Sequence, residues 1–178
     1  MAEQRVVATV RECPGRLVPV GTPVTIPAHT FVTITQSLGG NFTVVYHGNM
    51  VRVDGTDADA LGLEKFELEF TDPGDGLIHE EQVWQALETV YDPEIPVNLK
   101  SLGLIYKVDI DQASGRVTID MTLTAPGCGM GPVLVGDVKY RVAMAPNVKS
   151  VEVELVFDPP WSRAMMSEEA QLETGMFY

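Results

Sequence analysis

The residue best suited to chemistry in this 178-residue chain is Cys128, which lies in a glycine-rich loop. The loop reads Thr122-Leu-Thr-Ala-Pro-Gly-Cys-Gly-Met-Gly-Pro132 and joins the expected end of a strand to the expected start of a helix. Backbone N–H groups and the helix dipole favour negative charge at a helix N-terminus, so the Cys128 thiol should ionise more easily than an ordinary thiol. A thiolate binds metal or attacks an electrophile. The alternative is a buried cysteine that packs as a small hydrophobe, but the flanking glycines, Thr122 and Thr124 argue against it.

A second candidate segment is Asp92-Pro93-Glu94-Ile95-Pro96, in which two prolines fix the backbone around two carboxylates. Carboxylates can ligate metal or accept protons. The alternative is a helix stop with Asp92 as a turn residue. The residues alone leave both interpretations open.

Cysteine usage and the remaining motifs narrow the chemistry. The two cysteines, Cys13 and Cys128, form neither a disulfide framework nor a CxxC zinc pair, which favours a reducing compartment. Cys13 has no ligand type nearby, and we expect it to be structural. The glycines of the Cys128 loop match neither a phosphate-binding loop nor a dinucleotide fingerprint.

The charge balance bears on partners and location. With 25 acidic and 12 basic residues the formal net charge is −13, which repels nucleic acid and anionic membranes. The N-terminus lacks the apolar core of a secretory signal, and no apolar run reaches the length of a membrane span. We therefore expect a cytoplasmic protein with no nucleic-acid or membrane partner.

The elements that must position these residues fall into two parts, with an expected boundary at Thr71–Gly76. Residues 1–75 read as a β-rich unit with short β-branched runs separated by turns, Pro14-Gly15 among them, and a helical turn near Asp57–Leu61. This pattern favours a small barrel or sandwich. The expected strands are Arg5–Val10, Val24–Ile26, Thr30–Thr35, Asn41–Tyr46 and Met50–Val53.

Residues 76–178 read as a compact domain in the order helix, strand, strand, helix, strand, so the fold class is α+β. The first helix carries apolar residues at helical spacing and is expected to end at Asp92-Pro93. Two alternating runs predict a hairpin, Pro132 opens a second helix, and Val151–Phe157 predicts a third strand. Ser167 and Gly175 predict the caps of a C-terminal helix.

Several of these segments together resemble a known family. Asp92-Pro-Glu-Ile-Pro96, Leu102-Gly-Leu-Ile105, Thr122-x-Thr-x-x-x-Cys128 and Asp158-Pro-Pro-Trp161 occur in the order seen in the metal-sulfur cluster biosynthesis family, the domain of SufT, PaaD-like proteins and cytosolic iron-sulfur targeting factors. The first half resembles the extension of the long SufT type. Gly129 stands where many relatives have proline, and Ala125 where many have a further threonine.

The resemblance implies a non-enzymatic auxiliary role in delivering or maturing iron-sulfur clusters. It carries the family cysteine onto Cys128 and the acidic motif onto Asp92 and Glu94, as ligands to transient iron or a cluster, with Thr122 and Thr124 contributing to the site. One thiol cannot hold a cluster alone, so a homodimer, a partner's cysteines or small thiols must complete the site. The implied partners are iron-sulfur scaffold or carrier proteins and apo-target proteins. Rival hypotheses are a metal-free adaptor, a thiol enzyme and a metal-binding regulatory domain without sulfide.

Overall fold

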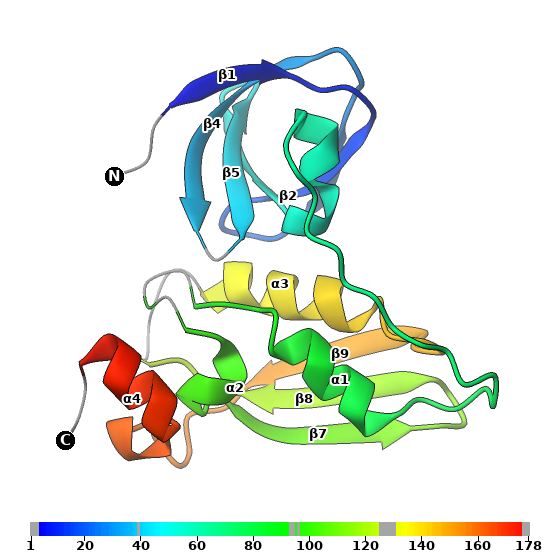
Figure 1. The fold of residues 1–178 in the computed structure, drawn as a ribbon, viewed down its shortest axis with the longest axis vertical. Coiled ribbons are helices and arrows are strands. Elements are labelled where there is room, and N and C mark those ends of the chain that lie inside the picture. The colour runs from blue at the N-terminus through cyan, green and yellow to red at the C-terminus, as the bar shows by residue number, and fades with distance from the viewer. Residues whose placement is uncertain (1–3, 39, 93–94, 96, 125–130, 176–178) are drawn as a thin grey trace. The chain divides into compact units, whose positions relative to one another are not determined.

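The protein is seen in a computed structural model that describes residues 4–38, 40–92, 95, 97–124 and 131–175 (Figure 1). The chain divides into two compact units, Met1–Leu68 and Glu69–Tyr178. The first holds a sheet, and the second combines helices with a smaller sheet, as an α+β fold class predicts. The division after Leu68 falls a few residues before the boundary expected from the sequence.

The N-terminal unit is a six-stranded antiparallel sheet in the order β1-β4-β5-β6-β2-β3. Its inner face encloses a core to which strands and the following 3-10 helix η1 (Gly55–Leu61) all contribute, including Ile26, Val44 and Leu61. The predicted helical turn is therefore confirmed. The strands are β1 (Arg5–Ala8), β2 (Cys13–Leu17), β3 (Pro23–Ile26), β4 (Phe31–Leu38), β5 (Asn41–Tyr46) and β6 (Asn49–Val53).

Strand β2 is missing from the sequence prediction, because Pro14-Gly15 is a pair typical of turns. In the structure both residues are paired with β3, Pro14 opposite Thr25 and Gly15 opposite Val24. A Cβ atom on Gly15 would collide with Cγ1 of Val51 and lie 3.1 Å from the carbonyl oxygen of Arg52. The glycine is thus explained by the close approach of β2 to β6, not by a turn.

The second unit contains a three-stranded sheet in the order β7-β8-β9, in which β8 pairs antiparallel with β7 and parallel with β9. Val117, Ile119 and Met121 alternate along β8 and are fully buried, and Figure 1 shows α1 and α3 on one face of this sheet. The predicted order is confirmed, with α2 added before β7. The elements are α1 (Glu80–Leu87), α2 (Leu99–Leu102), β7 (Ile105–Asp111), β8 (Arg116–Met121), α3 (Gly131–Val142), β9 (Ser150–Leu155), η2 (Arg163–Met165) and α4 (Glu168–Thr174).

Two helix ends test the sequence prediction in opposite ways. Helix α4 is capped as predicted, since the Ser167 hydroxyl accepts a hydrogen bond from the Ala170 N–H at 3.1 Å and Gly175 has a φ of 73°. Helix α1, however, ends at Leu87, so its predicted end at Asp92 is wrong. Tyr91 instead forms a β-bridge with Asn98.

Candidate functional site

Asp92 lies in a tight turn between α1 and α2. Its carboxylate Oδ1 accepts a hydrogen bond from the Ile95 N–H at 3.0 Å, and its own N–H donates to the Val97 carbonyl at 3.2 Å. The residue is 9% exposed. Asp92 therefore acts as a turn residue, although it does not stop α1, which ends at Leu87. Its role as a metal ligand stays a prediction. Glu94, the other predicted carboxylate, lies outside the described residues.

Thr122 directly follows β8 and continues its pairing, because the Thr122 N–H donates to the Leu104 carbonyl at 2.8 Å. Its side chain is fully buried, and its Oγ1 has no hydrogen-bond partner among the described residues. A buried hydroxyl without a hydrogen-bond partner lowers the stability of a fold, so the Thr122 Oγ1 is available to bind a ligand at the end of the strand. Thr124 is partly buried, and Cys128 lies outside the described residues.

The two flanks of the Cys128 loop meet each other. A Cβ atom built on Gly131, the first residue of α3, would lie 3.1 Å from Cδ1 of Leu123 and 3.6 Å from Cδ1 of Leu155. The chain therefore leaves β8 and enters α3 at one place at the end of the sheet. Gly131 permits this close approach because it has no side chain.

The turn that contains Asp92 is called the acidic turn below. Helix α2 connects it to the end of β8 through backbone hydrogen bonds. The Leu99 N–H donates to Val90 at 2.9 Å, the Leu104 N–H donates to Leu99 at 3.1 Å, and Leu104 in turn accepts from Thr122. Asn98 starts α2, since its Oδ1 accepts from the Ser101 N–H at 2.9 Å. The structure thus joins the segments of Asp92 and Thr122 at one end of the sheet, where Figure 1 shows α2.

The C-terminal segment holds α2 and the start of β7 from another side. The Trp161 indole Nε1 donates to the Leu102 carbonyl at 2.6 Å, and the Tyr106 hydroxyl donates to the Pro159 carbonyl at 2.7 Å. The Ser167 N–H donates to the carbonyl of Ser101 at 2.8 Å. Sequence reasoning missed this support. The Asp158-Pro-Pro-Trp161 segment entered the sequence analysis only as one motif of the family resemblance.

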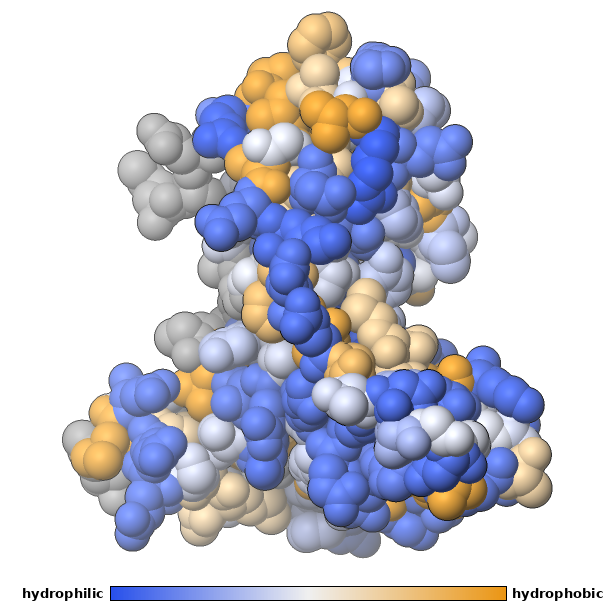
Figure 2. Space-filling view, turned by 45° about the vertical axis from the view of Figure 1, so that its right-hand side comes forward, coloured by the Kyte–Doolittle hydropathy of each residue, from blue (hydrophilic) through white to orange (hydrophobic). Residues whose placement is uncertain are grey.

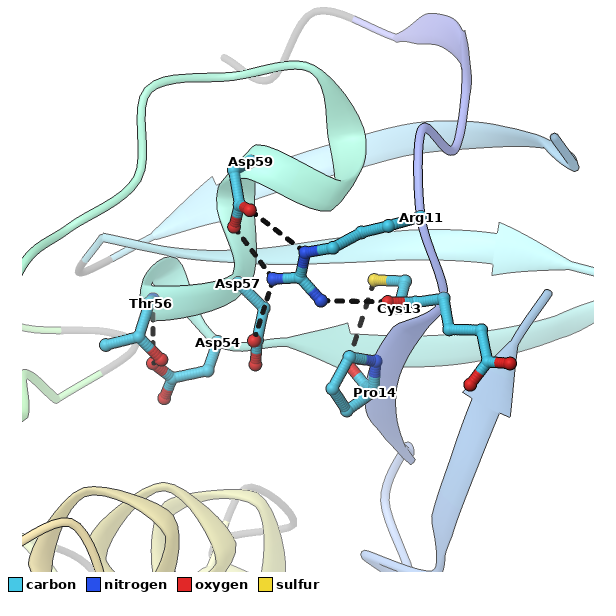
Figure 3. A network of polar contacts seen from close by, with 8 residues as sticks. Arg11, Cys13, Pro14, Asp54, Thr56, Asp57 and Asp59 are labelled. Carbon is cyan, nitrogen blue, oxygen red and sulfur yellow. Dashed lines mark hydrogen bonds and ion pairs between the residues drawn. The ribbon is translucent and has the colours of Figure 1, made fainter. Parts of the chain in front are cut away.

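Cys13 is a structural thiol, as expected. Its side chain is fully buried in the N-terminal core, and burial, reinforced by the carboxylate of Asp57, raises the pKa of the thiol to about 11. The nearby Arg11 guanidinium opposes that rise but is itself paired with Asp57 at 3.2 Å and Asp59 at 2.8 Å (Figure 3). Cys13 is therefore neutral and shielded at physiological pH.

Metal-ligand groups and membrane spans are absent from the part of the chain that the structure describes. Among those residues, no three His, Cys, Asp or Glu side chains group as metal ligands do. No helix in the same ranges is long and apolar enough to cross a bilayer.

Known proteins match the second half of the chain. The sequence pattern of the family described as iron-sulfur cluster assembly protein matches residues 80–155. The Fe-S protein maturation auxiliary factor of Porphyromonas gingivalis is 52% identical over 96 residues, which span 54% of this chain and 90% of that protein. The factor of Bacillus subtilis called YitW is 45% identical over 96 residues, or 93% of its length.

A solved structure agrees with these sequence matches. The crystal structure of a domain of unknown function from Bacillus anthracis is 39% identical, has a TM-score of 0.52, and covers 55% of this chain and 92% of that chain. The chain belongs to the iron-sulfur cluster assembly protein family. The expected resemblance is thereby confirmed for the second half, while the likeness of the first half to the long SufT extension stays a prediction.

Proposed function

We propose that this chain is an auxiliary factor of iron-sulfur protein maturation that passes iron or a cluster to apo-proteins through Cys128. The observation that supports this proposal most is the 52% identity over 96 residues with an Fe-S protein maturation auxiliary factor. In the structure of this chain, α2 links the acidic turn to the end of β8, the strand that precedes Cys128 in the sequence. The cargo is a substrate here, held for transfer. The work takes place in the cytoplasm, with scaffold or carrier proteins as donors.

The expected chemistry of the site follows from its position in the sequence. Cys128 falls between the residues of β8 and those of α3, a helix of 12 residues whose N-terminal dipole would favour a nearby thiolate. A thiolate is a ligand that iron favours, and a cluster takes about four such ligands. One cysteine therefore holds the cargo only together with thiols of a partner, which suits transfer better than storage. Asp92 holds the turn through its hydrogen bond with the Ile95 N–H. In this proposal the carboxylates of Asp92 and Glu94 ligate the iron or accept the thiol proton.

The test is anaerobic reconstitution with iron and sulfide, followed by absorption spectroscopy and iron and sulfide analysis. We expect the wild-type chain to bind both, and Cys128→Ser to lose them. Cys13→Ala is the matched control, because it removes the other thiol, which is buried and has a raised pKa. Equal loading of wild type and Cys128→Ser would overturn the proposal. Colourless, metal-free wild-type protein would favour the metal-free adaptor.

A further inference from the structure

The N-terminal unit has a cavity of about 720 Å³ at the end of the sheet where β5 begins and β6 ends. Cavities of this size bind small ligands or parts of a partner. The lining consists of Gly40, Phe42, Gly55 and all four residues of the segment 64–67. These residues lie outside residues 80–155, which the family pattern matches, so membership of the family assigns this cavity no role.

Hydrogen bonds fix both walls of the cavity. The Phe66 N–H donates to the Gly55 carbonyl at 2.8 Å, which holds the segment 64–67 against the start of η1. The Gly55 N–H donates to Oδ1 of Asn41 at 2.8 Å in a buried hydrogen bond, and Asn41 directly precedes Phe42. The walls are therefore in place before a ligand binds, which lowers the entropic cost of binding.

Two aromatic rings form the apolar part of the lining. Phe42 is partly buried and packs against the core of the unit, whereas Phe66 is 41% exposed. Aromatic rings attract cations through the negative potential of their faces. Arginine is the cation that suits such a lining best, because its planar guanidinium stacks on a ring and is weakly hydrated.

The charged side chains of the lining favour the same ligand. Glu64 and Glu67 supply two carboxylates and Lys65 one ammonium group, and all three residues are exposed at the rim. After the Arg11 hydrogen bond, Lys65 also contributes to the low pKa of the Asp59 carboxyl, so its charge is partly balanced within the unit. An anionic ligand would meet two carboxylates, whereas a guanidinium pairs with them through charge-assisted hydrogen bonds.

We propose that this cavity binds an arginine side chain on the surface of a partner protein. The guanidinium lies against the phenylalanine rings and pairs with Glu64 or Glu67. Because the cavity is larger than one side chain and its charged rim is exposed, it admits the arginine together with the backbone that carries it. Figure 2 shows hydrophilic and apolar side chains mixed on the surface of this unit, as binding of an amphipathic group requires.

The experiment titrates the full-length, isotope-labelled chain with the peptide acetyl-Gly-Arg-Gly-amide and follows the backbone amides by NMR. We expect saturable shifts at Gly40, Gly55 and Phe66. The same peptide with citrulline, which keeps the shape of arginine without its charge, should bind at least about tenfold more weakly. N-acetyl-arginine amide should also bind more weakly than the tripeptide, because it lacks the flanking backbone.

Substitutions at the rim give effects of opposite sign. Glu67→Gln should weaken binding of the arginine peptide by at least about threefold, and Lys65→Gln should strengthen it. Phe66→Leu should weaken binding because it keeps an apolar side chain but removes the ring. Glu12→Gln is the matched control, since Glu12 is an exposed glutamate of the same unit that does not line the cavity.

Several outcomes would overturn this proposal. They are the absence of saturable shifts in the wild-type chain, equal binding of the citrulline peptide, and equal weakening by Glu12→Gln and Glu67→Gln. Binding of N-acetyl-arginine amide as tightly as the tripeptide would rule out a protein as the source of the arginine. Cys128→Ser should bind the peptide like wild type without metal, so the failure of iron binding and the failure of this site are separate results.

Discussion

The indole N–H of Trp161 lies 2.6 Å from the carbonyl oxygen of Leu102, so a residue after the last strand fixes the end of α2. The same helix connects the acidic turn to Thr122 through backbone hydrogen bonds. The C-terminal segment is therefore part of the support of the candidate site, although it contributes no ligand type to it.

Trp161→Phe should lower the free energy of unfolding of the second unit by about 1 kcal/mol, because the Leu102 carbonyl loses a partner while the aromatic packing stays. Urea unfolding followed by circular dichroism measures the change in both variants. Trp84→Phe is the control, since that indole donates only to the Glu80 carboxylate at the surface. An equal effect of both substitutions would contradict the supporting role of Trp161.

Gly103→Ala should destabilise the second unit by more than backbone conformation alone explains. Gly103 has a φ of 73°, and a Cβ atom there would collide with the Met165 carbonyl oxygen and lie 2.9 Å from the carbonyl carbon. Gly175 has the same φ with nothing within 4 Å, so Gly175→Ala isolates the conformational cost of about 1 kcal/mol that an L-residue incurs in the left-handed region. Chemical denaturation should show the larger loss for Gly103→Ala, and equal losses would refute the close approach of the C-terminal segment.

Thr122→Val should leave stability unchanged or raise it, because it removes a buried hydroxyl that has no partner among the described residues. If that hydroxyl serves the cargo, iron retention after reconstitution should fall in the same variant. Thr118→Val, on the partly buried side of β8, is the control and should retain iron. A clear loss of stability in Thr122→Val would show that the hydroxyl is satisfied in solution.

Ionisation of Cys13 should destabilise the N-terminal unit at alkaline pH. The thiol pKa rises from its ordinary 9.0 in the unfolded chain to about 11 when folded. The stabilising contribution is therefore complete below about 9 and is lost as the pH rises through about 11. Urea titrations at both ends of this window, with Cys13→Ala subtracted to remove other titrating groups, measure the loss. A difference that does not change with pH would disprove the raised pKa.

Arg11→Gln should raise the pKa of the Asp59 carboxyl toward its ordinary value, because the Arg11 guanidinium holds it low through hydrogen bonds of 2.8 and 2.9 Å. Since the folded pKa is lowered, the pairing stabilises the unit above the ordinary pKa and is lost as the pH falls. Carboxyl NMR titration measures the shift. The pKa of Asp75, held low mainly by the Leu77 N–H, is the internal control and should not move.

The sequence predicted the features that depend on neighbouring residues, such as helix caps, better than those that depend on contacts between distant segments. The caps at Ser167 and Gly175 are set by adjacent backbone groups, and both were found as predicted. Gly15 was misread because its reason is a contact with Val51, 36 positions away along the chain. The predicted end of α1 is wrong because the backbone of Tyr91 pairs with that of Asn98, and this β-bridge is incompatible with a helix that continues to Asp92.

The candidate site was predictable in type but not in support. Residue types and spacing identified Cys128 and the Asp92 segment, whereas the link between them depends on backbone hydrogen bonds of Leu99 and Leu104. Backbone hydrogen bonds use groups that all residues except proline share, so the amino-acid sequence does not reveal them. The complete burial of Thr122 likewise depends on packing that a strand pattern does not encode.

From the close approach of Gly131 to Leu123 we expect that the segment between them can be exchanged. Because Leu123 and Gly131 approach each other closely, the two ends of the segment between them are held near one another by the strand and the helix. A loop from a relative with proline after the cysteine can be grafted between Leu123 and Gly131 on the same framework. Differences in metal binding between grafts would then be properties of the inserted segment, which makes the chain a host for comparing the loops of the whole family.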